Sequence, residues 1–498
     1  MRNGNNWWTE MKHSTYLVSV GCLVFLVCTF FFTLITLDPI SWLVIYEKTD
    51  LVPGTVSYAQ WKEPKIDIYF QAYMFNLTNP EEFVGGAKPR VQQVGPYTYR
   101  EHRIKTDMSE QHTGSTIEYR ERIYYYFVPE LSVGPESDVV TTVNLAYIQI
   151  DVQFGWLPAA VDRVIELLEN RTEDYLITTR TVRELLWGYE DPFLRFLYNM
   201  FIPVPTTMIG LYWNKNGTER ELTEIYRNNK DQARFGQVYK FQGQTKLSVW
   251  TTSEANKLNG SDGSLFHPFL QWKEQPYVFT ADICRSIQLR PTSEVKFAGV
   301  PVYRYLPFED TFRSALNTEK NRGFCLNWPN CLKDNVHDMT TCMPGAPIVM
   351  SLPHLMHADP EYQNAVEGLH PNDDLNTSFL IEPKTGVVFK AQKKLQINAR
   401  VKNNPKFREL SLVHNVFLPV MFMNESFTID TETVSSLRLS VYTGPIVVKT
   451  ILSILLIVCA LILFVIVARK YWYAGSTPTN VPYQELSTGT APETQESV

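Results

Sequence analysis

The apolar stretch Tyr16–Leu37, YLVSVGCLVFLVCTFFFTLITL, contains 22 residues and no charged side chain. As an α-helix it would be about 33 Å long, close to the hydrocarbon thickness of a bilayer, about 30 Å. A helix satisfies its own backbone hydrogen bonds, as a segment surrounded by lipid must. We therefore predict a transmembrane helix over residues 15–37, preceded by a cytosolic tail over residues 1–14.

A cleaved signal peptide is the alternative for so early a segment. Its apolar region would contain about 7–15 residues, followed by small residues at a cleavage site. The stretch here is longer and continues into Asp38-Pro39-Ile40-Ser41-Trp42, which has no small-x-small pattern. An uncleaved anchor is favoured.

A second apolar run, Ile451–Ala468, contains 18 residues without a charge and is followed by Arg469-Lys470. Basic residues next to a span are typical of its cytosolic side. We predict a second transmembrane helix over residues 446–468 and both termini in the cytosol. Residues 469–498, rich in Ser, Thr, Pro and Glu, are expected to be disordered.

Residues 38–445 then form one loop outside the cytosol, long enough for one large domain or two closely joined ones. The 46 basic and 52 acidic residues of the chain are dispersed, so no nucleic-acid partner is expected. Six Asn-x-Ser/Thr sequons lie in this loop and none lies in the tails, which favours luminal or extracellular exposure. They are Asn76, Asn170, Asn216, Asn259, Asn376 and Asn424.

Four of the seven cysteines lie in the same loop, at Cys284, Cys325, Cys331 and Cys342. An even number of cysteines outside the cytosol predicts two disulfides, for which three connectivities are open. A zinc site would need paired spacings of about two to four residues. The observed intervals of 41, 6 and 11 residues do not fit such a site.

Alternating apolar residues predict a strand-rich domain, an antiparallel barrel or sandwich. The segment Lys65–Met74 places Ile66, Ile68, Phe70, Ala72 and Met74 on one side of a strand, and Gly95-Pro96 is expected to interrupt the pattern. Further strand-like segments cover residues 118–128, 238–250, 293–306, 386–401 and 412–423.

The middle of the chain predicts a small helical bundle over about residues 156–202. Apolar residues at helical spacing begin it, at Val161, Val164, Ile165 and Leu168. Thr181 and Glu184 form a capping box for a short helix that ends at Gly188. Residues 193–201 are expected to form another helix.

The sequence contains no catalytic constellation. A phosphate loop, a Gly-x-Ser-x-Gly elbow and a His-Glu-x-x-His motif are all missing from it. His354 and His357 could share a metal by their spacing, but ordinary hydrogen-bonded histidines are favoured. We expect neither an enzyme nor a cofactor or metal. In the tail, Tyr483-Gln-Glu-Leu486 matches the tyrosine-based signals that clathrin adaptors bind as extended peptides.

Several longer stretches resemble stretches of the class B scavenger receptor family and occur in the same order as in that family. This family includes fatty acid translocase, the high-density-lipoprotein receptor and the lysosomal integral membrane protein. The stretches are NPEEF from Asn79, GPYTYRE from Gly95, RELLWGYEDPF from Arg183, DICRSI from Asp282, GVPVYRY from Gly299, SLPH from Ser351, GLHPN from Gly368, IEPKTG from Ile381 and LQIN from Leu395.

The resemblance implies an α+β fold, in which an antiparallel barrel-like core is capped by an apical helical bundle and contains an apolar tunnel towards the membrane. It implies the disulfides Cys284–Cys342 and Cys325–Cys331. It also implies binding of fatty acids, sterols, phospholipids and lipoprotein or other particles. The expected apical contacts are Val161, Val164, Ile165, Leu168 and Arg171. Arg171 matches the first of two apical lysines of fatty acid translocase, whereas Glu173 occupies the second position, so the apex is acidic.

We expect a scavenger receptor of the plasma membrane or the endosome–lysosome membrane that binds lipids and promotes their uptake. Two alternatives belong to other classes: a trafficking receptor that escorts a luminal protein to lysosomes, with Tyr483 and Leu486 as its sorting signal, and a phagocytic recognition receptor. The oligomeric state stays open.

Overall fold

The computed structural model describes residues 4–154, 175–202, 204, 206–227 and 234–475. It divides into two compact units, residues 1–42 with 442–498 and residues 43–441. Helices α1 (Gly4–Thr49) and α10 (Gly444–Gly475) supply the described part of the first unit. Segments within Ser14–Thr49 and Thr431–Trp472 are long and apolar enough to cross a membrane. The two predicted flanking helices are thus present as candidate membrane spans, and both continue beyond their apolar runs.

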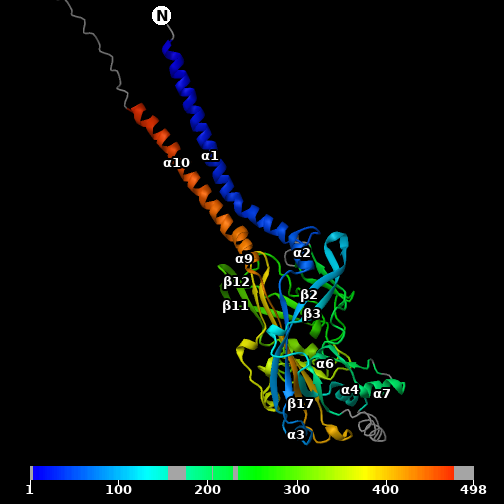
Figure 1. Cartoon of the computed structure of the whole chain (residues 1–498). Coiled ribbons are helices and arrows are strands. Elements are labelled where there is room, and N and C mark those ends of the chain that lie inside the picture. Colours follow the sequence, from blue (N-terminus) through cyan, green and yellow to red (C-terminus); the bar gives the residue numbers. More distant parts are fainter. Residues whose placement is uncertain (1–3, 155–174, 203, 205, 228–233, 476–498) are drawn as a thin grey trace, which may run out of the picture. The chain divides into compact units, whose positions relative to one another are not determined.

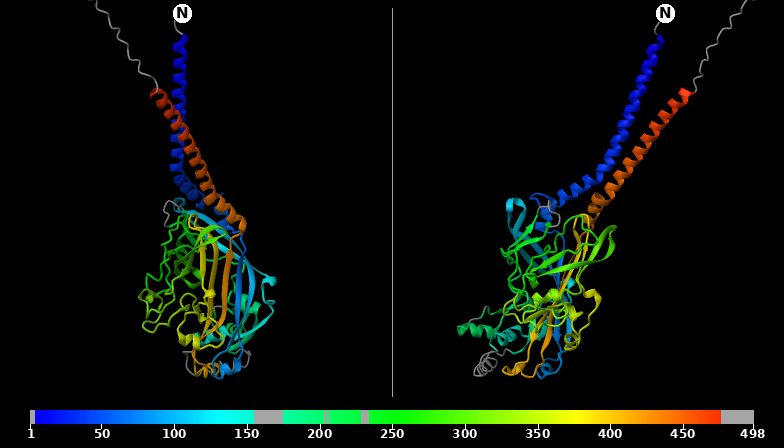
Figure 2. Two further views of the ribbon diagram at one scale, coloured as in Figure 1. Left: turned by 90° about the vertical axis from the view of Figure 1, so that its left-hand side faces the viewer. Right: turned by 180° about the vertical axis from the view of Figure 1, so that it is seen from behind.

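The larger unit contains a 13-stranded sheet (Figure 2) with antiparallel strand pairs, in the order β10-β11-β12-β15-β16-β17-β1-β2-β3-β8-β9. β14 pairs with β16, and β13 pairs with β14. The two ends of the path approach each other at Ser261, which bridges both Gln237 beside β9 and Val278 of β10. The sheet is therefore nearly closed. The strands are β1 (Ile68–Leu77), β2 (Val91–Gln111), β3 (Thr116–Phe127), β8 (Thr223–Tyr226), β9 (Val238–Phe241), β10 (Tyr277–Thr280), β11 (Arg285–Phe297), β12 (Val300–Pro307), β13 (Val336–Asp338), β14 (Ile348–Ser351), β15 (Ser378–Ile381), β16 (Val388–Val401) and β17 (Val416–Thr428).

Short helices occupy both ends of this unit. Figure 1 places α2 and α9 at one end, where the chain enters and leaves the unit, and α3, α4 and α7 at the other. The remaining elements are α2 (Val56–Lys62), α3 (Pro80–Val84), α4 (Leu145–Phe154), α6 (Val182–Trp187), α7 (Pro192–Asn199), α8 (Pro360–Asn364), α9 (Thr431–Leu437), β4 (Val139–Val143), β5 (Ile177–Thr181), β6 (Tyr189–Glu190) and β7 (Met208–Ile209). The α+β class with a barrel-like sheet is confirmed.

The helical region agrees with its sequence signals where the structure describes it. Thr181 Oγ1 accepts a hydrogen bond from the Glu184 backbone N–H at 3.2 Å, and Glu184 Oε2 accepts one from the Thr181 N–H at 2.9 Å. This capping box begins α6, and Gly188, with φ of +110°, ends it. α4 was not predicted, because half of residues 145–154 are β-branched or aromatic. Residues 155–174 of the predicted bundle lie outside the described part.

Three strand predictions need correction. Gly95-Pro96 does not interrupt a strand, because β2 continues through it with a shift of register against β1 between Ala72 and Met74. A Cβ on Gly95 would lie 2.8 Å from the Ala72 carbonyl oxygen, so only glycine permits this approach. Residues 293–306 form a hairpin that turns at Ala298 and Gly299, both with positive φ. The segment from Val238 ends as a strand at Phe241, where Gln242 and Gly243 turn the chain.

Candidate functional site

A cavity of about 2200 Å³ lies inside the larger unit. Apolar side chains of the sheet form much of its wall, among them Ile68, Ile123, Ile287, Leu289, Phe379 and Val388. Residues of α2 and α9 line it as well, including Trp61 and Leu437. The cavity therefore reaches the end of the unit at which the chain enters and leaves.

The opposite end of the sheet is packed. Ala72, Met74, Met421 and Met423, from the inward faces of β1 and β17, are at most 2% exposed. No residue of α3, α7 or the described α4 lines the cavity. A tunnel that continues to these helices remains a prediction.

Six charged side chains form a group, called here the ionic cluster, at the boundary between the cavity and the packed interior. They are Glu101, Arg103, Arg220, Asp282, Lys393 and Glu425, and all except Glu101 line the cavity. Arg103 Nε donates to Glu101 Oε2 at 2.7 Å, and Arg103 Nη2 lies 2.8 Å from Glu425 Oε1. One guanidinium therefore joins two carboxylates.

The second half of the ionic cluster centres on Asp282. Lys393 Nζ lies 2.6 Å from Asp282 Oδ2, whereas Arg220 Nη1 lies 3.6 Å from Asp282 Oδ1. Lys393 also lies 4.0 Å from Glu425, which connects the two halves. Arg220 Nη2 donates to the Tyr125 hydroxyl at 3.1 Å. The links of Arg220 to Asp282 and of Lys393 to Glu425 are too long for hydrogen bonds.

The environment of the ionic cluster shifts its pKa values in opposite directions. Burial, together with the charge of Glu425, raises the pKa of Glu101 to about 7, although the Arg103 guanidinium opposes this shift. The positive charge of Lys393, helped by Arg220, holds the pKa of Asp282 below its ordinary range despite burial. Glu101 is therefore the member that can exchange a proton near neutral pH.

This cluster was not predicted from the sequence, although a signal for it exists. Lys393 lies two residues from the apolar Ala391 and Leu395 on its strand. Glu425 likewise lies two residues from Met423 and Phe427. In a strand, residues two apart share a face. A charged residue on the apolar face of each of two strands therefore predicts an internal ion pair.

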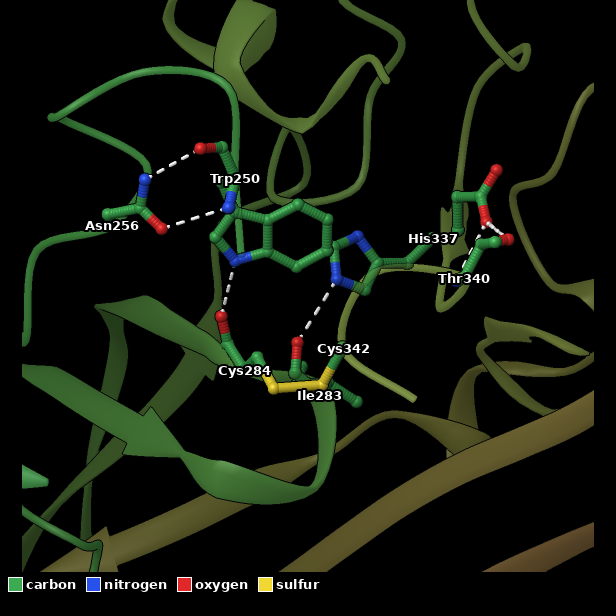
Figure 3. Close-up of a disulfide and its surroundings, with 8 residues drawn as sticks. Trp250, Asn256, Ile283, Cys284, His337, Thr340 and Cys342 are labelled. Carbon is green, nitrogen blue, oxygen red and sulfur yellow. Dashed lines mark hydrogen bonds between the residues drawn. A yellow bond between two sulfur atoms is a disulfide. The ribbon is translucent and has the colours of Figure 1, made fainter. Parts of the chain in front are cut away.

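The two disulfides are Cys284–Cys342 and Cys325–Cys331, the pairing that the family resemblance implies. Figure 3 shows that two side chains beside the Cys284–Cys342 disulfide form hydrogen bonds to backbone carbonyl groups. Trp250 Nε1 donates to the Cys284 carbonyl at 2.6 Å, and the buried His337 bonds through Nε2 to the Ile283 carbonyl at 3.2 Å. These contacts fix the turn that presents the neighbouring Asp282 to the ionic cluster.

The predicted glycosylation sites differ in their surroundings. Asn216 is exposed, Asn76, Asn259 and Asn376 are half-buried, and Asn424 is 8% exposed. Asn424 Nδ2 donates to Gln71 Oε1 at 2.8 Å. Asn170 lies outside the described residues, and occupancy at all six sequons remains a prediction.

Other predicted site residues also lie outside the described part. They are the apical residues Val161, Val164, Ile165, Leu168 and Arg171 and the tail residues Tyr483 and Leu486. His354 uses both ring nitrogens within the protein, since Nδ1 accepts from the His370 backbone N–H at 3.1 Å and Nε2 bonds to Gln93 Oε1 at 2.7 Å. Among the described residues, no group of three or more His, Cys, Asp or Glu side chains is arranged to hold a metal ion.

Comparison with known proteins shows the family. The model of the CD36 family matches residues 18–470. The chain belongs to the CD36 family. The resemblance to the class B scavenger receptors is thereby confirmed.

Relatives of this CD36-family chain include lysosome membrane protein 2 and scavenger receptor class B member 1. The human lysosome membrane protein 2 is 37% identical over 407 residues, which cover 81% of this chain and 84% of that protein. Bovine scavenger receptor class B member 1 is 30% identical over 422 residues, covering 83% of this chain and 81% of the relative. Family membership, the two terminal helices and the disulfides together support a role as a membrane scavenger receptor.

Proposed function

We propose that this protein is a two-pass membrane receptor that takes up lipid from particles and passes it through the cavity of its ectodomain. The observation that carries the proposal is the cavity of about 2200 Å³ with its apolar wall. The known ligand sites of proteins are typically concave and mostly apolar, with a few placed polar groups. This cavity has both features, since the ionic cluster lies on one part of its wall.

Lipid transfer needs a dry route because the transfer of an acyl chain through water is unfavourable in proportion to its apolar area. Side chains of α2 and α9 border the cavity at the end where the chain enters and leaves the ectodomain. Lipid that reaches this end would arrive beside the two segments that lead to the membrane helices. The ligands of the proposal are fatty acids, sterols, phospholipids and lipoproteins, and the proposed role is that of a receptor rather than an enzyme.

The proposed topology places residues 1–14 and 469–498 in the cytosol, residues 15–37 and 446–468 in the membrane, and residues 38–445 outside the cytosol. The six sequons and the two disulfides all lie in the last of these segments. The name of lysosome membrane protein 2 supports residence in the lysosomal membrane, and we propose the plasma membrane as the second location. A clathrin adaptor that binds Tyr483 and Leu486 would account for movement between them.

Blocking the cavity tests the proposal. Ala391 lines the cavity and is 7% exposed, so Ala391→Trp would project an indole into it. Ala87 is exposed and lies off the cavity wall, and Ala87→Trp is the matched control. We expect Ala391→Trp to lose most lipid uptake by cells at equal surface expression, with the control unchanged. Equal uptake by both variants would contradict the cavity route.

A second candidate function, escort of a luminal protein, is favoured by an exposed apolar group at the C-terminal end of α7. Tyr198, Met200 and Phe201 are 63%, 59% and 95% exposed. Exposed apolar patches often mark protein interaction sites. If escort is the function, Phe201→Ala should abolish delivery of a luminal protein to lysosomes while lipid uptake is retained. Tyr483→Ala should move the receptor to the cell surface, and an unchanged distribution would exclude that sorting signal.

A further inference from the structure

The ionic cluster is in contact with open volume although it lies deep in the fold. Arg103, Arg220, Lys393, Glu425 and Asp282 keep 20–35% of their side-chain surface exposed. All five line the cavity, so a molecule inside it can reach them. The charged groups are thus available to a ligand and are not confined to internal pairing.

The charges follow one another in strict alternation. Each member of the ionic cluster forms its ion pairs with members of opposite sign, in the order Glu101, Arg103, Glu425, Lys393, Asp282 and Arg220. The two ends of this series carry unused hydrogen-bonding capacity. Glu101 Oε1 and Arg220 Nε are buried without a hydrogen-bond partner among the described residues. One end therefore lacks a donor and the other lacks an acceptor.

The contact between Arg220 and Asp282 is the place where a ligand can enter with least loss. Its 3.6 Å separation exceeds hydrogen-bonding distance, and Asp282 keeps its 2.6 Å contact with Lys393 whether or not Arg220 stays in place. Arg220 can therefore turn to a new acceptor, and Asp282, the most exposed member at 35%, can accept a new cation.

The sign of the charges selects the ligand. A purely anionic head group would pair with Arg220 but would place a negative charge beside Asp282. An uncharged head group would replace neither partner, and leaving a buried charge unpaired is strongly unfavourable. A head group with one negative and one positive charge can pair with both residues at once, so that every charge retains an opposite partner.

We propose that the ionic cluster is an internal head-group site for zwitterionic phospholipids, with the phosphate on Arg220 and the amine on Asp282. The acyl chain lies along the apolar wall formed by residues such as Ile287 and Leu289. This assignment rests on the proposed lipid-binding function and adds to it a preference among lipids.

The test compares four lipids with the same oleoyl chain, so that the apolar contribution cancels. The full chain in a non-ionic detergent is titrated with lysophosphatidylcholine, lysophosphatidylethanolamine, lysophosphatidic acid and monooleoylglycerol, by displacement of a fluorescent oleoyl probe. We expect the two zwitterions to bind at least tenfold more tightly than the other two. Arg220→Gln should remove this advantage and change the binding of monooleoylglycerol by less than twofold.

The control is Arg122→Gln, since Arg122 pairs with Glu219 and does not line the cavity. A wild-type preference for lysophosphatidic acid would overturn the assignment in favour of a simple anion site. An equal loss of all four lipids in Arg220→Gln would also overturn it, because the role of Arg220 would then be structural. If the wild type binds none of the four, including monooleoylglycerol, the proposed lipid-binding function itself fails.

Discussion

Lys393 and Glu425 face each other across the antiparallel strands β16 and β17, and Lys393 Nζ lies 4.0 Å from Glu425 Oε2. Their neighbours on the same strand faces are apolar. Each charge depends on the other members of the ionic cluster for compensation, because these side chains are at most 35% exposed. The stability of the barrel should therefore depend on the balance of these charges more than on any single contact.

We predict that Lys393→Met lowers the free energy of unfolding by about 3–5 kcal/mol, because one negative charge is left in excess. The double variant Lys393→Met/Glu425→Met leaves the balanced pairs Glu101–Arg103 and Asp282–Arg220. It should be more stable than Lys393→Met alone. Denaturant unfolding of the full chain in detergent measures the free energy of unfolding of the wild type, the two single variants and the double variant. If the loss in the double variant equals the sum of the two single losses, charge balance is not the cause.

The pKa of Glu101 links folding to pH. Burial raises this pKa to about 7, so the folded chain binds a proton that the unfolded carboxyl releases above about pH 4.5. Its contribution to stability is full below about pH 4.5 and is lost as the pH rises to 7. Burial lowers the pKa of His337 to about 3 and that of His354 to about 4. The contribution of these two histidines to stability is full above about pH 6.5 and is lost as the pH falls.

We therefore predict that Glu101→Gln steepens the fall in unfolding free energy between pH 7 and pH 5. The expected difference from the wild type over this range is on the order of 2 kcal/mol. Unfolding curves of both proteins at several pH values provide the measurement. Parallel curves would show that Glu101 is already ionised in the folded chain at pH 5.

Gly260 lies next to the residue that brings the two ends of the sheet together. A Cβ at this position would lie 1.9 Å from the Tyr277 carbonyl oxygen, and φ is +84°. We predict that Gly260→Ala lowers the free energy of unfolding by roughly 3 kcal/mol or more. Gly243→Ala is the control, because Gly243 has a similar φ of +76° and open space around it. It should cost about 1–2 kcal/mol, and equal effects of both substitutions would argue against tight packing at the closure.

The two disulfides should differ in their effect on stability because they close loops of different length. Their sequence separations are 58 and 6 residues. Loop entropy predicts losses of about 4 kcal/mol for Cys284→Ala/Cys342→Ala and about 2 kcal/mol for Cys325→Ala/Cys331→Ala. Thermal unfolding at matched expression compares them. A larger loss for the shorter loop would show that local packing, and not chain entropy, dominates.

Some local features follow directly from short-range patterns. The capping box at Thr181 and Glu184 depends on groups three residues apart, so the start of α6 was predictable. The strand at Phe70 and Ala72 was predictable for the same reason, because its apolar residues alternate. Gly95 misled the sequence analysis, since glycine ends a strand in some settings and permits a bulge in others. The choice depends on Ala72, which lies on the neighbouring strand.

The two candidate membrane helices, the strand-rich domain between them and the family were predictable, because each is encoded in composition, periodicity or motifs within contiguous segments. The near closure of the sheet at Ser261, the cavity that the sheet surrounds and the ionic cluster beside it were visible in the folded chain alone. Such contacts join residues as far apart as Arg103 and Glu425. Their proximity is a property of the folded chain, because the register of the strands, and not the spacing of residues along the sequence, brings them together.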